Sequence, residues 1–162
     1  MDANYYIKLA IIIFLFINLL CPLLKVFRKV IRKKLRYKRY LDSPLAAVDK
    51  MKGEEFEEYL AAHFRKLGYC VSMTPKSNDY GADLVLKKNG IITVVQAKRY
   101  RDKVGIKAIQ EIIGAKGYYK AEKMMVVTNS YFTSGALKLA ESNDVDLWDR
   151  NSINKFFKIR KE

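Results

Sequence analysis

The sequence is short of cysteine and histidine, the residues from which disulfide frameworks and structural zinc sites are built. Its two cysteines, Cys21 and Cys70, fall in no C-x-x-C pair or other metal-ligand spacing. The first lies in an apolar run and the second in a predicted strand, so we expect no bridge between them. The one histidine, His63, has no partner that suggests metal binding, and we interpret it as a surface or boundary residue. These absences favour a reducing, cytosolic setting for the soluble part.

Acidic residues are also scarce, which makes the chain strongly basic. Lys and Arg number 31 against 17 Asp and Glu, a formal net charge of +14. Much of this excess precedes residue 44, where ten basic and two acidic residues accompany a hydrophobic segment. A basic balance favours association with nucleic acid or anionic lipid without choosing between them. No internal repeat or low-complexity tract is visible.

The hydrophobic segment predicts a membrane anchor over residues 1–27. From Leu9 to Leu24 only Asn18 and Pro22 are not apolar, which approaches the ~20 residues that span a bilayer. Basic residues follow from Lys25, so the positive-inside rule predicts a single pass through the cell membrane, with the N-terminus outside and the rest cytoplasmic. A cleaved signal peptide is the alternative, but its charges would precede the apolar core.

The residues between this segment and the soluble domain, 28–43, predict a basic juxtamembrane helix or linker. Apolar residues recur in it at helical spacing among the basic ones. Such a helix suits an anionic lipid surface, where each basic residue contributes about 1 kcal/mol. Contact with DNA is the alternative.

Residues 44–162 predict one α/β domain. Phe56, Leu60, Phe64 and Leu67 keep one apolar face and predict a helix over 49–67. After it we expect strands over 70–74, 82–88 and 91–99, a helix over 105–120, a strand over 123–130, a helix over 133–144, a strand over 145–149 and a helix over 151–159. This order implies a mixed central sheet flanked by helices.

A hairpin gathers polar residues at the ends of two of these strands. Asn89-Gly90 between apolar runs favours a two-residue type I′ loop, so residues whose numbers sum to 179 face each other. Asp83 then pairs with Gln96. Lys98 lies two residues beyond Gln96 and shares its face of the sheet.

This cluster predicts metal-assisted phosphodiester hydrolysis. The carboxylate of Asp83, the amide oxygen of Gln96 and the carbonyl of Ala97 suit Mg²⁺, which prefers oxygen ligands. The metal would help to generate a hydroxide. Lys98 could orient the attacking water and stabilise charge on the phosphate. The alternative is a salt bridge between Asp83 and Lys98 that only sets the register.

At these residues the sequence resembles the Mrr-like branch of the PD-(D/E)xK nuclease superfamily, from about Met51 to Trp148. The matching segments are "GEEFEEYLAAHFRKLGY", "TPKSNDYGADLVL", "VVQAKRY", "VGIKAIQE" and "VVTNSYFTSGALKLA". The resemblance implies a restriction-endonuclease-like core that acts on DNA with Mg²⁺, for which Mn²⁺ could substitute. The full prediction is therefore this core, with a mixed central sheet, preceded by a transmembrane helix.

The resemblance also implies roles for single residues. Asp83 would bind metal and Lys98 would be the catalytic lysine, while Gln96 stands where much of the superfamily has an acidic residue. Glu57 matches the acidic residue of the first helix and would partly restore the missing charge. The predicted DNA contacts are Arg99, Lys103, Lys107 and Gln110.

Partners follow from these roles. DNA and the membrane are the expected partners, and cutting both strands would need two active sites, which predicts a homodimer. A catalytically weak or inactive nuclease-fold module that binds DNA at the membrane is the alternative function, since Gln96 is neutral. An interaction protein unrelated to DNA is a third option, against which intact Asp83 and Lys98 argue.

Overall fold

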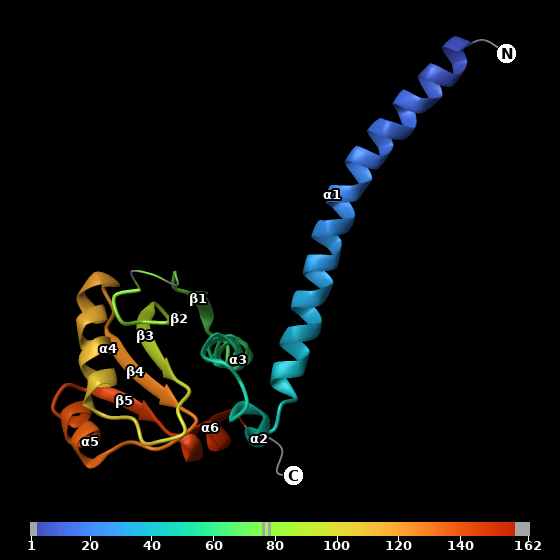
Figure 1. Ribbon diagram of the computed structural model, residues 1–162. Coiled ribbons are helices and arrows are strands. Elements are labelled where there is room, and N and C mark those ends of the chain that lie inside the picture. The colour runs from blue at the N-terminus through green and yellow to red at the C-terminus, as the bar shows by residue number, and fades with distance from the viewer. Residues whose placement is uncertain (1–2, 76, 78, 158–162) are drawn as a thin grey trace. The chain divides into compact units, whose positions relative to one another are not determined.

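The chain divides into two compact units. The computed structural model describes residues 3–75, 77 and 79–157, except the side chains of 3–5, 7–10, 12 and 13. The first unit is Met1–Lys38 and the second is Arg39–Glu162. The second unit holds the sheet and all the predicted site residues (Figure 1).

The helix α1, Ala3–Leu41, carries the hydrophobic segment. Basic residues follow this segment from Lys25. Within the described part of the chain, no helix is apolar over enough of its length to cross a membrane. The predicted transmembrane helix and the single-pass membrane localisation are therefore wrong.

The second unit is built on a five-stranded mixed sheet in the order β1-β2-β3-β4-β5. The first three strands pair antiparallel, and β3, β4 and β5 pair parallel. The strands are β1 (Cys70–Met73), β2 (Leu84–Lys88), β3 (Ile91–Lys98), β4 (Lys123–Thr128) and β5 (Val145–Trp148). The predicted mixed sheet flanked by helices is confirmed.

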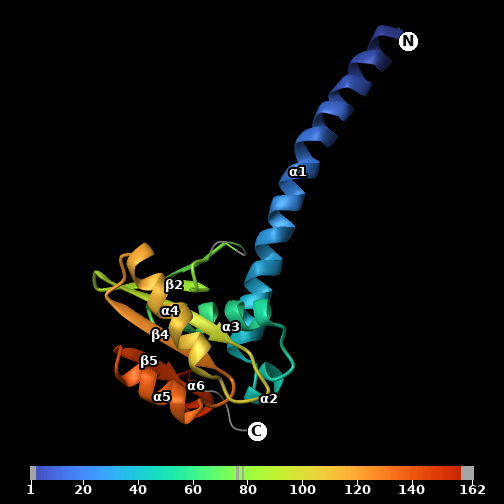
Figure 2. The ribbon, with the colours of Figure 1, turned by 60° about the vertical axis from the view of Figure 1, so that its left-hand side comes forward.

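Helices cover both faces of this sheet. They are α2 (Leu45–Val48), α3 (Gly53–Lys66), α4 (Ile106–Tyr118), α5 (Ser134–Glu141) and α6 (Arg150–Phe157). Figures 1 and 2 show α3 on one face and α4 with α5 on the other. The predicted order of elements within the domain is confirmed, and α2 is an addition. Residues 158 and 159 of the predicted last helix lie outside the described residues.

The predicted helix 49–67 begins four residues late, at Gly53. Asp49 instead caps the end of α2, and its carboxylate pairs with Arg150, 2.7 Å from Oδ1, and accepts a hydrogen bond from Asn129. The carboxylate of Glu55 instead accepts the Lys52 N–H at the start of α3. An acidic side chain there satisfies one of the unpaired donors of the first turn.

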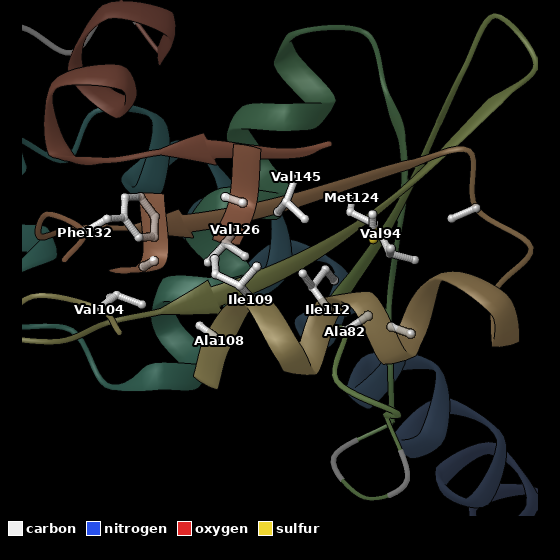
Figure 3. Packing of buried hydrophobic residues seen from close by; sticks show 14 residues of the cluster. Ala82, Val94, Val104, Ala108, Ile109, Ile112, Met124, Val126, Phe132 and Val145 are labelled. Atoms are coloured by element: carbon white, nitrogen blue, oxygen red, sulfur yellow. The ribbon is translucent and has the colours of Figure 1, made fainter. Parts of the chain in front are cut away.

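The core on the α4 face joins three strands to α4 and α5. Figure 3 shows Val94, Met124 and Val126 of the sheet packed against Ile109 and Ile112 of α4. Side chains alternate along a strand, so Gln96 and Lys98 share the α4 face with Val94. Val85 also packs against this cluster, which places Asp83 on the same face.

The core on the α3 face is rich in aromatic residues and encloses His63. The imidazole is 1% exposed and lies between Tyr59 and Phe157, with ring centroids 4.5 and 4.4 Å away. Its Nε2 lies 3.2 Å from the carbonyl oxygen of Tyr40. The interpretation of His63 as a surface or boundary residue is wrong, because α6 folds back over this face of α3.

Candidate active site

The β2–β3 hairpin has the register that the sequence predicts. Asn89 and Gly90 both have positive φ, 52° and 83°, as a type I′ turn requires. Leu84 lies opposite Val95 and Leu86 opposite Thr93, so paired numbers sum to 179. The paired residues end at Leu84–Val95, and the Asp83 N–H donates to the Val95 carbonyl at 2.8 Å, one residue before its predicted partner Gln96.

The Asp83 carboxylate is held by the end of β3. Its Oδ2 accepts the Ala97 N–H at 2.7 Å and also the Gln96 Nε2–H. The bonds from Ala97 and Gln96 both fall on Oδ2, which leaves Oδ1 for another ligand. The backbone carbonyl of Asp83 accepts both the N–H and the hydroxyl of Thr74, each at 3.0 Å. The Gln96 amide, with its nitrogen turned to Asp83, directs its oxygen elsewhere.

Burial sets the charge state of this carboxyl group. Desolvation raises the pKa of Asp83 above its ordinary value, and the negative charge of Asp79 adds to the increase. The Ala97 N–H, the Lys98 ammonium and the Gln96 amide oppose this shift without cancelling it. A partly desolvated carboxylate held by hydrogen bonds gains from a nearby cation, since the cation offsets the cost of its burial.

The ammonium of Lys98 is paired with α4. Its Nζ lies 2.7 Å from Oε2 of Glu111, and the side chains are only 18% and 29% exposed. Oε2 is shielded from solvent and, among the described groups, has no hydrogen bond of regular geometry beyond this ion pair. Lys98 also acts on Asp83 through its charge. The alternative of a salt bridge between Asp83 and Lys98 is therefore not the pairing that the structure forms.

The loop before Asp83 packs directly onto α4. Asp79 Oδ1 accepts the Gly81 N–H at 3.0 Å, and the Asp79 carbonyl accepts the Tyr119 hydroxyl at 3.1 Å. Gly81 has φ +91°, and a Cβ there would lie 2.3 Å from the Glu111 carbonyl oxygen. Only glycine fits such an approach in that conformation. This contact brings the Asp83 strand end and the Lys98–Glu111 pair together.

Comparison with known proteins identifies the family. Residues 48–157 match the family model Mrr_cat, described as restriction endonuclease, over more than half of the chain. The chain belongs to this restriction endonuclease family. No curated protein matches it.

Three solved structures resemble this restriction endonuclease domain. The DNA modification-dependent restriction endonuclease AspBHI is 20% identical, with a TM-score of 0.56 over 76% of this chain and 35% of that one. AF1548, a protein of unknown function, is 15% identical, with a TM-score of 0.51 over 57% of this chain and 55% of that one. MspJI restriction endonuclease, in complex with a 27-mer oligonucleotide, is 15% identical, with a TM-score of 0.49 over 77% of this chain and 30% of that one. The chain spans about a third of AspBHI and MspJI and just over half of AF1548.

Glu57, the predicted metal ligand from the first helix of the domain, is half-buried on α3. The charged groups that shift the pKa of Asp83 are Lys98 and Asp79. Among the described residues, no three His, Cys, Asp or Glu gather where they could hold a metal ion. A metal set of Asp83, Glu57, Gln96 and Ala97 therefore stays a prediction.

The predicted DNA contacts lie where β3 passes into α4. Lys103, Lys107 and Gln110 are exposed, and Arg99 is half-buried. The Val104 N–H donates to the Tyr131 carbonyl at 2.8 Å, which ties this connection to the segment after β4. Exposed basic side chains such as Lys103 and Lys107 suit phosphate contacts. The roles of all four residues in DNA binding stay predictions.

Glu111 is the functional candidate that sequence reasoning missed. It is the next residue after Gln110, about 100° further round α4. Ala108, Ile112 and Ala115 are buried against the sheet, and Glu111 lies at the edge of that buried stripe while Gln110 points to solvent. A carboxylate beside the apolar stripe of a helix that follows a polar strand end is the signal that could have found it.

Proposed function

We propose that the chain is a Mg²⁺-dependent endonuclease that hydrolyses DNA phosphodiester bonds. The observation that carries this proposal is the contact of Asp83, Gln96 and the end of β3 beneath α4, in a domain of the restriction endonuclease family. The N–H groups at the end of β3 hold the Asp83 carboxylate on Oδ2, so that Oδ1 remains as an oxygen ligand near the cationic Lys98, and a carboxylate with an ammonium group is a combination that metal-assisted phosphodiester hydrolysis uses.

The oxygen donors suit a hard cation. Asp83 would bind through Oδ1, because its Oδ2 already accepts two N–H groups. The Gln96 amide oxygen, the Ala97 carbonyl and Glu57 would complete the set, with Mn²⁺ as a substitute for Mg²⁺. A metal ion bound here polarises the phosphate and lowers the pKa of bound water. Gln96 contributes no charge, so the neutralisation of the cation would fall to Asp83 and Glu57.

Lys98 would act on the phosphate and the attacking water. Its ammonium has three donors, and the ion pair with Glu111 at 2.7 Å engages one direction only. The remaining donors would orient the water and stabilise the charge that develops on the phosphate oxygens. Glu111 would then be a positioning residue, since it acts by holding Lys98 and touches no substrate.

A cleavage assay with matched lysine variants tests the proposal. The full chain is incubated with modified, unmodified and branched DNA in Mg²⁺, in Mn²⁺ or in EDTA. Cleavage should need the metal and should be lost in Asp83→Ala and Lys98→Ala. Lys87→Ala is the matched control, because Lys87 is exposed at the opposite end of the same hairpin. Absence of cleavage on every DNA, or full activity in Lys98→Ala, would overturn the catalytic assignment.

A DNA-binding module without cleavage is the second candidate, and the neutral Gln96 favours it. Replacing an acidic ligand with an amide weakens the hold on a metal ion before DNA binds. Salt-sensitive DNA binding that persists in EDTA, together with no hydrolysis in Mg²⁺ or Mn²⁺, would support this version. Sedimentation of the DNA complex checks the homodimer that double-strand cleavage would need.

A further inference from the structure

A cavity of about 460 Å³ opens at the carboxyl ends of β3 and β4. The residues that line it come from four segments and are Asp49, Tyr100, Arg101, Asn129, Ser130, Tyr131 and Arg150. Its volume falls in the range of small-ligand sites in proteins, about 300–1,000 Å³. Ligands of open α/β sheets bind outside the carboxyl ends of the strands. Its position and size therefore suit a ligand.

Three of the lining residues, Asp49, Asn129 and Arg150, are held in place by hydrogen bonds to one another. The Arg150 guanidinium bonds both oxygens of Asp49, at 2.7 and 2.9 Å, and also the Asn129 carbonyl at 3.0 Å. Asn129 donates to Asp49 at 2.9 Å and accepts the Tyr100 N–H at 2.9 Å. Burial alone would raise the pKa of Asp49, but the bonds from Arg150 and Asn129 hold it below its ordinary value. The one carboxylate in the lining is thus neutralised by its own partners.

The remaining lining groups are aromatic and cationic. Tyr100 is 49% exposed and Tyr131 is 42% exposed, and both line the cavity, so both leave surface for a ligand. Arg101 is exposed, and nearby Arg99 has a buried Nε without a hydrogen-bond partner among the described groups. Arg99 lies close enough to Asp49 to act on it through its charge. Stacking rings beside guanidinium groups are the features that bind unpaired nucleotides.

We propose that this cavity binds one nucleotide of the DNA strand beside the bond to be cut, outside the base stack. The base would stack on Tyr100 and Tyr131, and the adjoining phosphate would contact Arg101. This inference rests on the proposed function, because it assigns a subsite to the same DNA.

Its distance from the candidate active site fits that assignment. Tyr100 follows Lys98 by two residues, about 7 Å of extended chain. The two sites are also joined through β4, since the Thr128 hydroxyl donates to the Lys98 carbonyl at 2.7 Å and accepts the Ser130 N–H at 3.1 Å. A base drawn into the cavity would therefore hold the strand near Lys98. Removing a base from its stack costs a few kcal/mol, which such a pocket must repay.

Fluorescence of 2-aminopurine tests the proposal without any need for cleavage. Every arm uses the full chain carrying Asp83→Asn, which prevents strand cutting, and a duplex with 2-aminopurine moved one position at a time. The fluorescence should change at one or two adjacent positions in the parent. The change should vanish in Tyr100→Ala and persist in the matched control Tyr100→Phe, which keeps the ring. Both variants should unfold at the temperature of the parent, since Tyr100 is half exposed.

Affinity supplies a second readout. Loss of one stacked base weakens binding by about 10- to 100-fold in Tyr100→Ala. Arg101→Gln should lower the slope of log Kd against log salt by about one, the signature of a lost phosphate contact. Signals that are unchanged by Tyr100→Ala, or equally lost in Tyr100→Phe, would overturn the proposal, as would an absence of DNA binding. A position-specific signal from a parent whose unmutated form cuts no DNA would support the cavity and count against the nuclease assignment alone.

Discussion

Acid should destabilise the second unit through one buried imidazole, and replacing His63 with phenylalanine should remove that effect. His63 is 1% exposed between Tyr59 and Phe157. Burial lowers its pKa from 6.5 to about 4, and the nearby charge of Lys66 adds to the decrease, while the hydrogen bond to Tyr40 opposes it. The folded state therefore excludes a proton that the unfolded chain accepts.

The sign and the size of the effect follow from this difference. A lowered pKa means that the stability from neutral His63 is fully present above pH 6.5 and is lost as the pH falls through about 4. Each pKa unit corresponds to about 1.4 kcal/mol, so the complete loss is about 3 kcal/mol and the loss between pH 7.5 and pH 5 is about 2 kcal/mol. This is a large part of the 5–15 kcal/mol that a domain typically has.

Urea unfolding at pH 7.5, 6 and 5 measures the effect, with the fluorescence of Trp148 as the probe. Trp148 is the only tryptophan and lies against Phe64 of α3, with ring centroids 5.4 Å apart. In His63→Phe a phenyl ring replaces the imidazole and still packs against Tyr59 and Phe157. The hydrogen bond to the Tyr40 carbonyl is lost, which lowers the free energy of unfolding by about 1 kcal/mol at pH 7.5. That carbonyl still accepts the Ser43 N–H at 3.2 Å.

The comparison isolates the imidazole because all other titrating groups are common to both proteins. The free energy of unfolding of His63→Phe should fall by about 2 kcal/mol less than that of the parent between pH 7.5 and pH 5. Equal losses in the two proteins would refute the reasoning, since they would show that His63 takes up a proton without unfolding the domain.

Three further predictions concern the candidate active site. Gly81→Ala should cost at least about 2 kcal/mol of stability in the same urea titration, because its Cβ would meet the Glu111 carbonyl at 2.3 Å. The control Gly90→Ala has nothing within 4 Å of its Cβ and should cost only the strain of its positive φ, about 1 kcal/mol. Glu111→Gln should lower kcat by up to about 100-fold with little change in KM, because Lys98 loses its anchor; a change confined to KM would contradict the positioning role. Asp83→Asn should abolish cleavage yet raise Tm at pH 7, because the raised pKa of Asp83 makes its ionised form a cost to folding; the gain should disappear below pH 4, where both proteins carry a neutral group.

Local patterns predicted the parts of the site that lie close together in sequence. Asn89-Gly90 allows one tight turn, and that turn sets every pair from Lys88–Ile91 to Leu84–Val95. The nearness of Asp83 and Gln96 at the strand ends could therefore be predicted before any tertiary contact was known. The two N–H groups on Asp83 Oδ2 show this nearness, while the catalytic roles of the residues stay predictions.

Contacts between distant segments were beyond the same reasoning. Asp49 and Arg150 are 101 residues apart and form an ion pair, and α3 begins at Gly53 and not, as predicted, at Asp49. The position of His63 on its helix predicts a surface or boundary residue, but α6 packs over it and buries it. Such pairings depend on how the chain returns to the sheet, which periodicity within one element does not contain.

The strand β3 changes character along its α4 face, and this change explains why Glu111 is needed. Val94 is covered by the isoleucines of α4, whereas Gln96 and Lys98 continue the same face beyond that apolar cover. An ammonium group at this half-buried place would be costly without a partner. Only a carboxylate from the helix above can compensate it while leaving Asp83 to its N–H donors, and the approach of Gly81 to the backbone of Glu111 brings that carboxylate into range. The glycine, the glutamate and the lysine therefore form one structural unit, and a change in any of them should be felt at the other two.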